Sequence, residues 1–68
     1  MGVRPHGYLL QRRIARAQVL LMRAETAVVE IALSVGFQSQ AHFSTVFKRL
    51  AGDSPSIWRR RALDGMHG

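Results

Sequence analysis

Four hydrogen-bonding side chains in the third quarter of the sequence could read the edges of DNA bases. Gln40, His42, Ser44 and Thr45 lie close together and carry no formal charge at pH 7. A glutamine can pair with adenine through two hydrogen bonds, a serine or threonine hydroxyl can bond to several base edges, and a threonine methyl can touch the methyl of thymine. The cluster predicts contacts with bases, although a solvated polar helix face would have a similar composition.

Cations and a serine surround this cluster and could hold a phosphate backbone. Lys48 and Arg49 follow it, and such residues contribute affinity without sequence information. Ser39 precedes it, and a serine at the start of a helix, with the first free backbone amides, can bind a phosphate. The remaining candidates, for which a solvated basic face is nearly as good an explanation, are Arg12, Arg13 and Arg16.

The charge balance of the whole chain points in the same direction. Ten lysines and arginines against four acidic residues give the 68 residues a formal net charge of +6. In one small domain, this favours a polyanionic partner such as nucleic acid or an anionic membrane. The chain has no cysteine, which rules out disulfides and thiolate metal sites and is consistent with a reducing cytoplasm.

Several classes of protein fit the sequence poorly. The histidines, His6, His42 and His67, lie far apart and no acidic cluster accompanies them, so we expect no metal or other cofactor. No apolar run approaches the roughly 18–20 residues of a membrane span, and the N-terminus lacks the apolar core of a signal peptide. The predicted location is the cytoplasm, on the nucleoid. Paired carboxylates, a nucleophile motif and a phosphate loop are missing, so we expect no enzyme.

Helical periodicity predicts an all-α fold that begins with a long amphipathic helix. Pro5 can occupy the first turn of a helix over residues 5–24. Thr26 is expected to cap the start of a second helix, from about residue 27 to residue 35. The apolar stripes recur at helical spacing and consist of Leu10, Ile14, Ala17 and Leu21 in the first helix and Val28, Ile31, Ala32 and Val35 in the second.

A tight turn and a third helix should follow. Gly36 can take the left-handed conformation that ends a helix, and Ser39 is a suitable N-cap for a helix that runs to Ala51. Residues 27–51 would then form a helix-turn-helix, in which the first helix holds the second against a major groove. The buried stripe of the third helix should contain Phe43, Val46, Phe47 and Leu50.

The sequence after the third helix predicts one more short helix. Gly52 should close the third helix, and Ser54 followed by Pro55 should begin a fourth over residues 54–63. Its apolar residues are Ile57, Trp58 and Leu63. We expect the Trp58 ring to cover the core with its indole N–H bonded to a carbonyl. Residues 64–68 should form a frayed tail.

Several short motifs also occur in one fixed order. They are Glu30-Ile31-Ala32, Gly36-Phe37, Phe43, Phe47-Lys48 and Gly52-x-Ser54-Pro55-x-x-Trp58-Arg59. This ordered set resembles the second helix-turn-helix of AraC/XylS-family transcription regulators. The stretch from Gly2 to Leu21 is similar to the end of the first subdomain of that family and to the helix that bridges the two. The resemblance covers nearly all of positions 2–61.

The resemblance implies sequence-specific DNA binding by a major-groove recognition helix, in a single truncated domain at 1–68 with a homeodomain-like three-helix core. The base-facing positions that it implies are Gln40, Ala41, His42, Ser44 and Thr45. The core positions that it implies are Ile31, Ala32, Phe37, Phe43, Phe47 and Trp58.

Other features depart from the family pattern. We expect this chain to lack the first helix-turn-helix of the family and any ligand-binding domain. Arg4 replaces a helix-capping serine or threonine, Ala41 removes a hydrogen bond from a base-facing position, and Trp58 replaces the more common tyrosine.

Double-stranded DNA is therefore the predicted partner, with no small-molecule ligand bound by this chain. Without the first subdomain, apolar residues of the long helix should be exposed, which predicts a homodimer through that helix. Those residues are Leu9, Leu10, Val19 and Leu20. Two other interpretations remain open: a basic amphipathic helix over residues 5–23 that binds a membrane or a protein partner, and a remnant that binds nothing.

Overall fold

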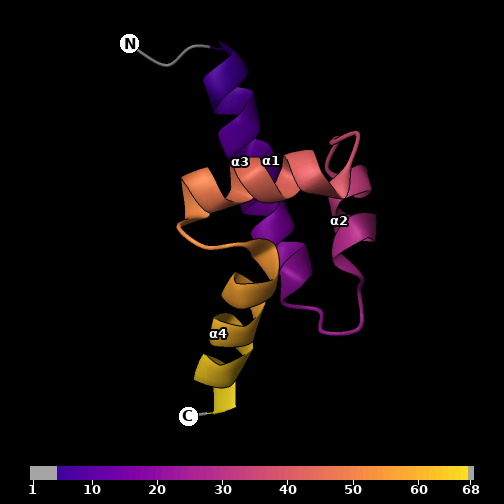
Figure 1. Ribbon diagram of the computed structural model, residues 1–68. Coiled ribbons are helices and arrows are strands. Elements are labelled where there is room, and N and C mark those ends of the chain that lie inside the picture. The colour runs from indigo at the N-terminus through magenta and orange to yellow at the C-terminus, as the bar shows by residue number, and fades with distance from the viewer. Residues whose placement is uncertain (1–4, 68) are drawn as a thin grey trace.

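The structure is a computed structural model that describes the backbone of residues 5–67 and the side chains of residues 7–65. It contains α1 (Pro5–Leu21), α2 (Val28–Ser34), α3 (Gln40–Ala51) and α4 (Pro55–His67), with no strand in the described part. The predicted all-α class is confirmed. In Figure 1, α3 crosses the middle of α1 and α2 lies at the N-terminal end of α3.

Some sequence predictions cannot be compared with the structure. Gly2, which belongs to the family motif, and Arg4, which departs from it, lie outside the described residues, as does Gly68 of the predicted tail. Among the helices that are described, none combines the length and the apolar character that a bilayer span requires.

One buried core holds the first three helices together. The Phe43 and Phe47 side chains are fully buried in it, as their spacing predicts. A row of aromatic rings runs from Phe37 through Phe43 and Phe47 to Trp58, with successive ring centroids 5.3, 5.5 and 5.8 Å apart. The first and last of these pairs meet edge-to-face, and such pairs stabilise a core beyond the area they bury. The buried apolar residues are Ile14, Ala17, Leu21, Ile31, Ala32, Val35, Phe37, Phe43 and Phe47.

Two residues predicted to be apolar contacts are exposed. Leu50 is 42% exposed and Ile57 is 48% exposed. Leu50 has the correct helical phase for the core, but it lies in the last turn of α3, and that end of the helix extends past α1 (Figure 1). The position of a helix end relative to its neighbours is a tertiary property, so periodicity alone could not show it.

Trp58 lies where the sequence predicts but does not make the predicted hydrogen bond. Its half-buried ring meets the Phe47 ring at an interplanar angle of 80°. The described residues offer no acceptor to the indole N–H, and no buried polar side-chain atom among them lacks a partner. The N–H is therefore accessible to water at the edge of the core.

The junction between α1 and α2 differs from the prediction. Because the amides of Met22 and Arg23 donate to carbonyls three residues back, at 3.2 and 3.0 Å, α1 ends at Leu21 rather than at residue 24. Ala27 rather than Thr26 is the N-cap of α2, and its side chain cannot cap. The carbonyl of Thr26 is instead part of a long-range contact with Arg59.

Arg59 connects α4 to this junction through three hydrogen bonds. Its Nε donates to the carbonyl of Leu21 at 2.8 Å, and its Nη2 donates to the carbonyls of Arg23 and Thr26 at 3.1 and 2.6 Å. The last carbonyls of a helix have no partner within the helix, so a guanidinium fork can satisfy several of them at once. We call these contacts the Arg59 latch. The latch fixes α4 to the end of α1 and to the residues that lead into α2.

The turns elsewhere agree with the sequence. Gly36 and Gly52 both have φ of +98°, a conformation that favours glycine. Ser54 precedes α4, and its hydroxyl accepts from the Ile57 amide at 3.5 Å. The fourth helix, however, continues to His67, so the prediction of a frayed tail from residue 64 is wrong. A single Gly65 costs a helix only about 1 kcal/mol and does not end it when the preceding turns are anchored.

Candidate nucleic-acid interface

α2, α3 and the residues between them have helix-turn-helix geometry. The amide of Phe37 donates to the carbonyl of Ala32 at 3.0 Å, and the Phe37 ring is buried under the turn. Ser39 caps α3, because its hydroxyl oxygen accepts from the His42 amide at 3.2 Å. The backbone turns at Gly36, and a short, tightly held turn of this kind fixes the direction of α3.

The buried residues of α3 determine which side of it faces outward. Phe43 and Phe47 point into the core, so Ala41, Thr45 and Lys48, which lie roughly opposite on the helix, occupy the centre of the outer face. All three are exposed. We call this surface, with its neighbours, the outer face of α3. It consists of Gln40, Ala41, His42, Ser44, Thr45, Lys48 and Arg49.

The structure brings the predicted base-contacting residues together, in unequal positions. Ser44 lies at one margin of the outer face and is half-buried, whereas Gln40 is exposed in the first turn and lies furthest of the set from the centre of that face. His42 lies at the other margin, with its ring edge-on to Phe37 at 5.3 Å. The Thr45 hydroxyl donates to the carbonyl of Ala41 at 3.0 Å, so its proton is engaged within the helix and its methyl and oxygen remain for a partner.

The predicted phosphate contacts fall in two separate places. Ser39, Lys48 and Arg49 belong to α3, with the serine at its start and the cations in its last turn. Within the described residues, the amides of Gln40 and Ala41 have no acceptor outside the helix ladder, as expected for the first amides of a helix. Arg12 and Arg16 lie on α1, next to the turn instead of next to the outer face of α3.

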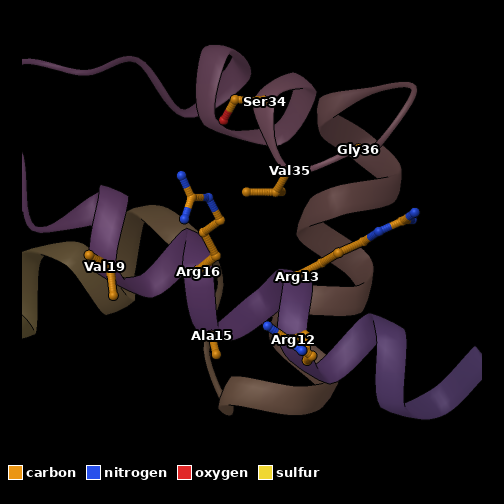
Figure 2. Close-up of a pocket in the computed structure, with 8 residues that line it drawn as sticks. All are labelled: Arg12, Arg13, Ala15, Arg16, Val19, Ser34, Val35 and Gly36. Carbon is orange, nitrogen blue, oxygen red and sulfur yellow. The ribbon is translucent and has the colours of Figure 1, made fainter.

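A groove of about 680 Å³ lies between α1 and the end of α2. Figure 2 shows Arg16 reaching toward Ser34 and Val35, and Arg13 extending along the side of the turn. The Arg13 guanidinium carbon lies 3.2 Å from where a Cβ on Gly36 would be. We call this site the basic groove. Its lining residues are Arg12, Arg13, Ala15, Arg16, Val19, Ser34, Val35 and Gly36.

A smaller hollow of about 320 Å³ adjoins the basic groove on the side of α3. Arg13 and Gly36 line both spaces, and Gln38 and His42 line the hollow on the side of α3. Gln38 was not among the predicted site residues. The feature of the sequence that could have indicated Gln38 is its position one residue before the N-cap of α3.

Within residues 7–65, no ion pair involves the cations of the basic groove or of α3. The ion pair in this part of the chain joins Arg61 to Asp53 at 2.6 Å, beyond the end of α3 that lies far from the turn. The arginines of the basic groove and the cations of α3 therefore keep their charge for another partner. The same residues contain no group of three metal-ligating side chains.

The sequence matches the family described as Helix-turn-helix domain over residues 1–61. It is 40% identical over 60 residues to the HTH-type transcriptional regulator MtrA of Neisseria gonorrhoeae, a match that covers 88% of this chain and 20% of MtrA. It is 43% identical over 61 residues to the HTH-type transcriptional activator RhaR of Klebsiella pneumoniae, covering 90% of this chain and 22% of RhaR.

A third relative shows the same pattern. The HTH-type transcriptional regulator ExsA of Pseudomonas aeruginosa is 38% identical over 59 residues, covering 87% of this chain and 21% of ExsA. The chain thus spans about a fifth of the length of these relatives. No solved structure matches it significantly. The ordered motifs, the helix-turn-helix geometry and the family match agree, and the chain belongs to the AraC-type helix-turn-helix family of DNA-binding domains.

Proposed function

We propose that this chain is the DNA-binding part of an AraC-type transcription regulator and forms one helix-turn-helix domain. The outer face of α3 enters the major groove and reads bases. The observation that carries the proposal is this face itself, which is hydrogen-bonding and uncharged in its first half, cationic in its last turn, and fixed from behind by Phe43 and Phe47. A face that only kept the helix soluble would carry more mixed charge.

The residues of the interface divide by the part of the DNA they contact. The proposed base contacts are Gln40, Ala41, His42, Ser44 and Thr45. The proposed phosphate contacts are Ser39, Lys48, Arg49, Arg12 and Arg16. Thr45 and Ala41 offer mainly methyl groups at the centre of the face, which suits thymine methyls, whereas Gln40 at the first turn suits the paired donor and acceptor of adenine. The domain acts in the cytoplasm, on the nucleoid, without catalysis.

One recognition helix contacts few bases, so we expect weak binding that depends strongly on salt. Affinity should lie near the non-specific range of roughly 10⁻⁴–10⁻⁶ M at physiological salt. Relatives named as transcriptional regulators and activators support a regulatory role, which this part of the chain would serve by locating a site on DNA.

The experiment is a selection of duplexes from a random pool, followed by fluorescence anisotropy on the enriched duplex and on a scrambled one. Gln40→Ala should reduce the preference for the enriched duplex, because it removes a base contact. Lys48→Ala should weaken binding to both duplexes by the same factor, because phosphates are common to both. Arg60→Ala, an exposed cation on α4, is the matched control. Equal losses on both duplexes for Gln40→Ala would sink the assignment.

A homodimer through α1 is a second proposal with its own observation. Leu9 is 47% exposed and Val19 is 67% exposed, whereas Leu10 and Leu20 are half-buried against the core. A dimer would cover the exposed pair and present two recognition helices to DNA. Sedimentation over a range of protein concentrations tests it. A monomer mass at every concentration would exclude it, whereas Leu9→Glu should abolish any dimer that forms.

A further inference from the structure

The basic groove gathers three arginines without a matching acid. Arg12 and Arg16 are exposed on successive turns of α1, and Arg13 lies between them, half-buried against the turn. No acidic side chain lines the groove. Like charges one helical turn apart repel each other. Arg12 and Arg16 therefore do not stabilise α1 by themselves. An anion in the groove would remove the repulsion.

The wall opposite the arginines offers no competing donor. The Ser34 hydroxyl donates to the carbonyl of Ile31 at 2.9 Å, and the Gly36 amide donates to the carbonyl of Leu33 at 3.1 Å. Recognition in the groove therefore depends on guanidinium groups. These present paired N–H donors in a planar fork that matches the oxygens of a phosphate.

Gly36 gives the groove its shape. A Cβ at this position would lie 3.2 Å from the Arg13 guanidinium carbon and 3.3 Å from its Nε. The absence of a side chain lets Arg13 extend along the turn, where it lines both the basic groove and the hollow that contains Gln38 and His42. Its guanidinium points away from that of Arg16 (Figure 2). The two spaces thus adjoin at Arg13 and Gly36.

We propose that the basic groove binds a phosphate group held by Arg16, with Arg12 and Arg13 at its rim. This inference rests on the proposed function, in which a DNA strand bound by α3 supplies the phosphate. A free phosphate ion presents the same oxygens, so the source has to be distinguished experimentally.

The first part of the experiment uses inorganic phosphate and amide NMR spectra of the full chain at constant ionic strength. Phosphate should shift the Ser34, Val35 and Gly36 signals in the wild type and in Arg60→Gln. The shifts should be lost in Arg16→Gln, and partly retained in Arg16→Lys, which keeps the charge but not the fork. Spectra of the variants without phosphate also show whether each is folded.

The second part measures anisotropy with a duplex at several salt concentrations. If the phosphate belongs to DNA, Arg16→Gln should weaken binding to every sequence and reduce the salt slope by about 0.9, the value expected for one lost phosphate contact. Arg60→Gln should leave the slope unchanged. Phosphate shifts in the groove with wild-type duplex affinity for Arg16→Gln would assign the site to a free phosphate.

The inference and the proposed function fail in different ways. Absence of phosphate shifts together with equal salt slopes for Arg16→Gln and Arg60→Gln would overturn the groove site, even if Gln40→Ala still alters sequence preference. Failure of the wild type to bind any duplex would overturn the proposed function, and the NMR experiment with inorganic phosphate would still decide whether the groove takes an anion.

Discussion

Replacing the half-buried Arg59 by alanine should destabilise the domain more than replacing either exposed cation of α4, Arg60 or Arg61. The side chain makes three hydrogen bonds to carbonyls 33 to 38 residues earlier in the chain, and two of the three are partly buried. A hydrogen bond with one charged partner contributes about 1.5–3 kcal/mol. Because water can reach the freed carbonyls at the surface and one of the three bonds is exposed, we expect a total loss smaller than the sum of three such bonds, about 2–4 kcal/mol.

This loss is large relative to the stability of so small a domain. A core of this size contributes only about 3–5 kcal/mol, so Arg59→Ala should leave the domain marginally folded. With a shift of about 4–8 °C for each kcal/mol, the midpoint of thermal unfolding should fall by roughly 10–30 °C. Circular dichroism at 222 nm, with urea denaturation to give the free energy of unfolding, measures both quantities.

Two companion variants separate the latch from charge. Arg60→Ala removes the same charge from the neighbouring exposed position, and its effect should stay within about 0.5 kcal/mol. Arg59→Lys keeps the charge but cannot donate to three carbonyls from a planar fork, so it should lie between the wild type and alanine. If Arg59→Ala and Arg60→Ala prove equally mild, the latch does not stabilise the fold and our reasoning is wrong.

Other substitutions give smaller and more specific effects. Gly36→Ala and Gly52→Ala share a φ of +98° and should each cost about 1–2 kcal/mol of unfolding free energy. At Gly36 the new Cβ displaces only the flexible end of Arg13, so a much larger cost there, measured by urea denaturation, would contradict this. Ser39→Ala should cost about 1 kcal/mol. Ser39→Asp should keep the stability but weaken duplex binding in anisotropy, and unchanged binding would remove Ser39 from the phosphate contacts. Arg61→Ala breaks an exposed ion pair and should cost less than about 1 kcal/mol; a larger loss of thermal stability would show that the pair matters more than its exposure suggests.

Local signals account for most of what the sequence predicted of the fold. Gly36 and Gly52 end helices because glycine readily adopts the left-handed backbone conformation found there. Ser39 begins a helix because its hydroxyl accepts from the amide three residues later. Helical spacing identified Phe43 and Phe47 as core. Each of these features involves residues within a few turns of one another, where spacing and chemistry are sufficient.

The sequence predictions were wrong where contacts between residues far apart in the chain determine the structure. The Arg59 latch joins residues more than thirty positions apart, and it involves the backbone carbonyl of Thr26, whose side chain was expected to cap α2. Leu50 has the periodicity of a core residue but lies in the last turn of α3, at the end that extends past α1. Nothing in the composition of residues 64–67 indicated that α4 would continue to His67.

In the candidate site, too, local features could be predicted from the sequence and long-range ones could not. The outer face of α3 follows from the helix phase that Phe43 and Phe47 impose, so its residues could be predicted together. The position of Arg16 beside Ser34, across from the end of α2, depends on how α1 packs against α2. The role of Arg13 additionally requires the missing side chain of Gly36, which was predicted only as a helix terminator.

The measurement that tests the central claim most directly is a titration of the isotope-labelled chain with a short duplex, followed in amide NMR spectra at low salt. If the outer face of α3 binds DNA, the signals of residues 39–48 should shift or broaden first. The amides of Val29 and Leu33, on the exposed side of α2, should stay unchanged as internal controls. Changes centred on Leu9 and Val19 of α1, with α3 unaffected, would contradict the account.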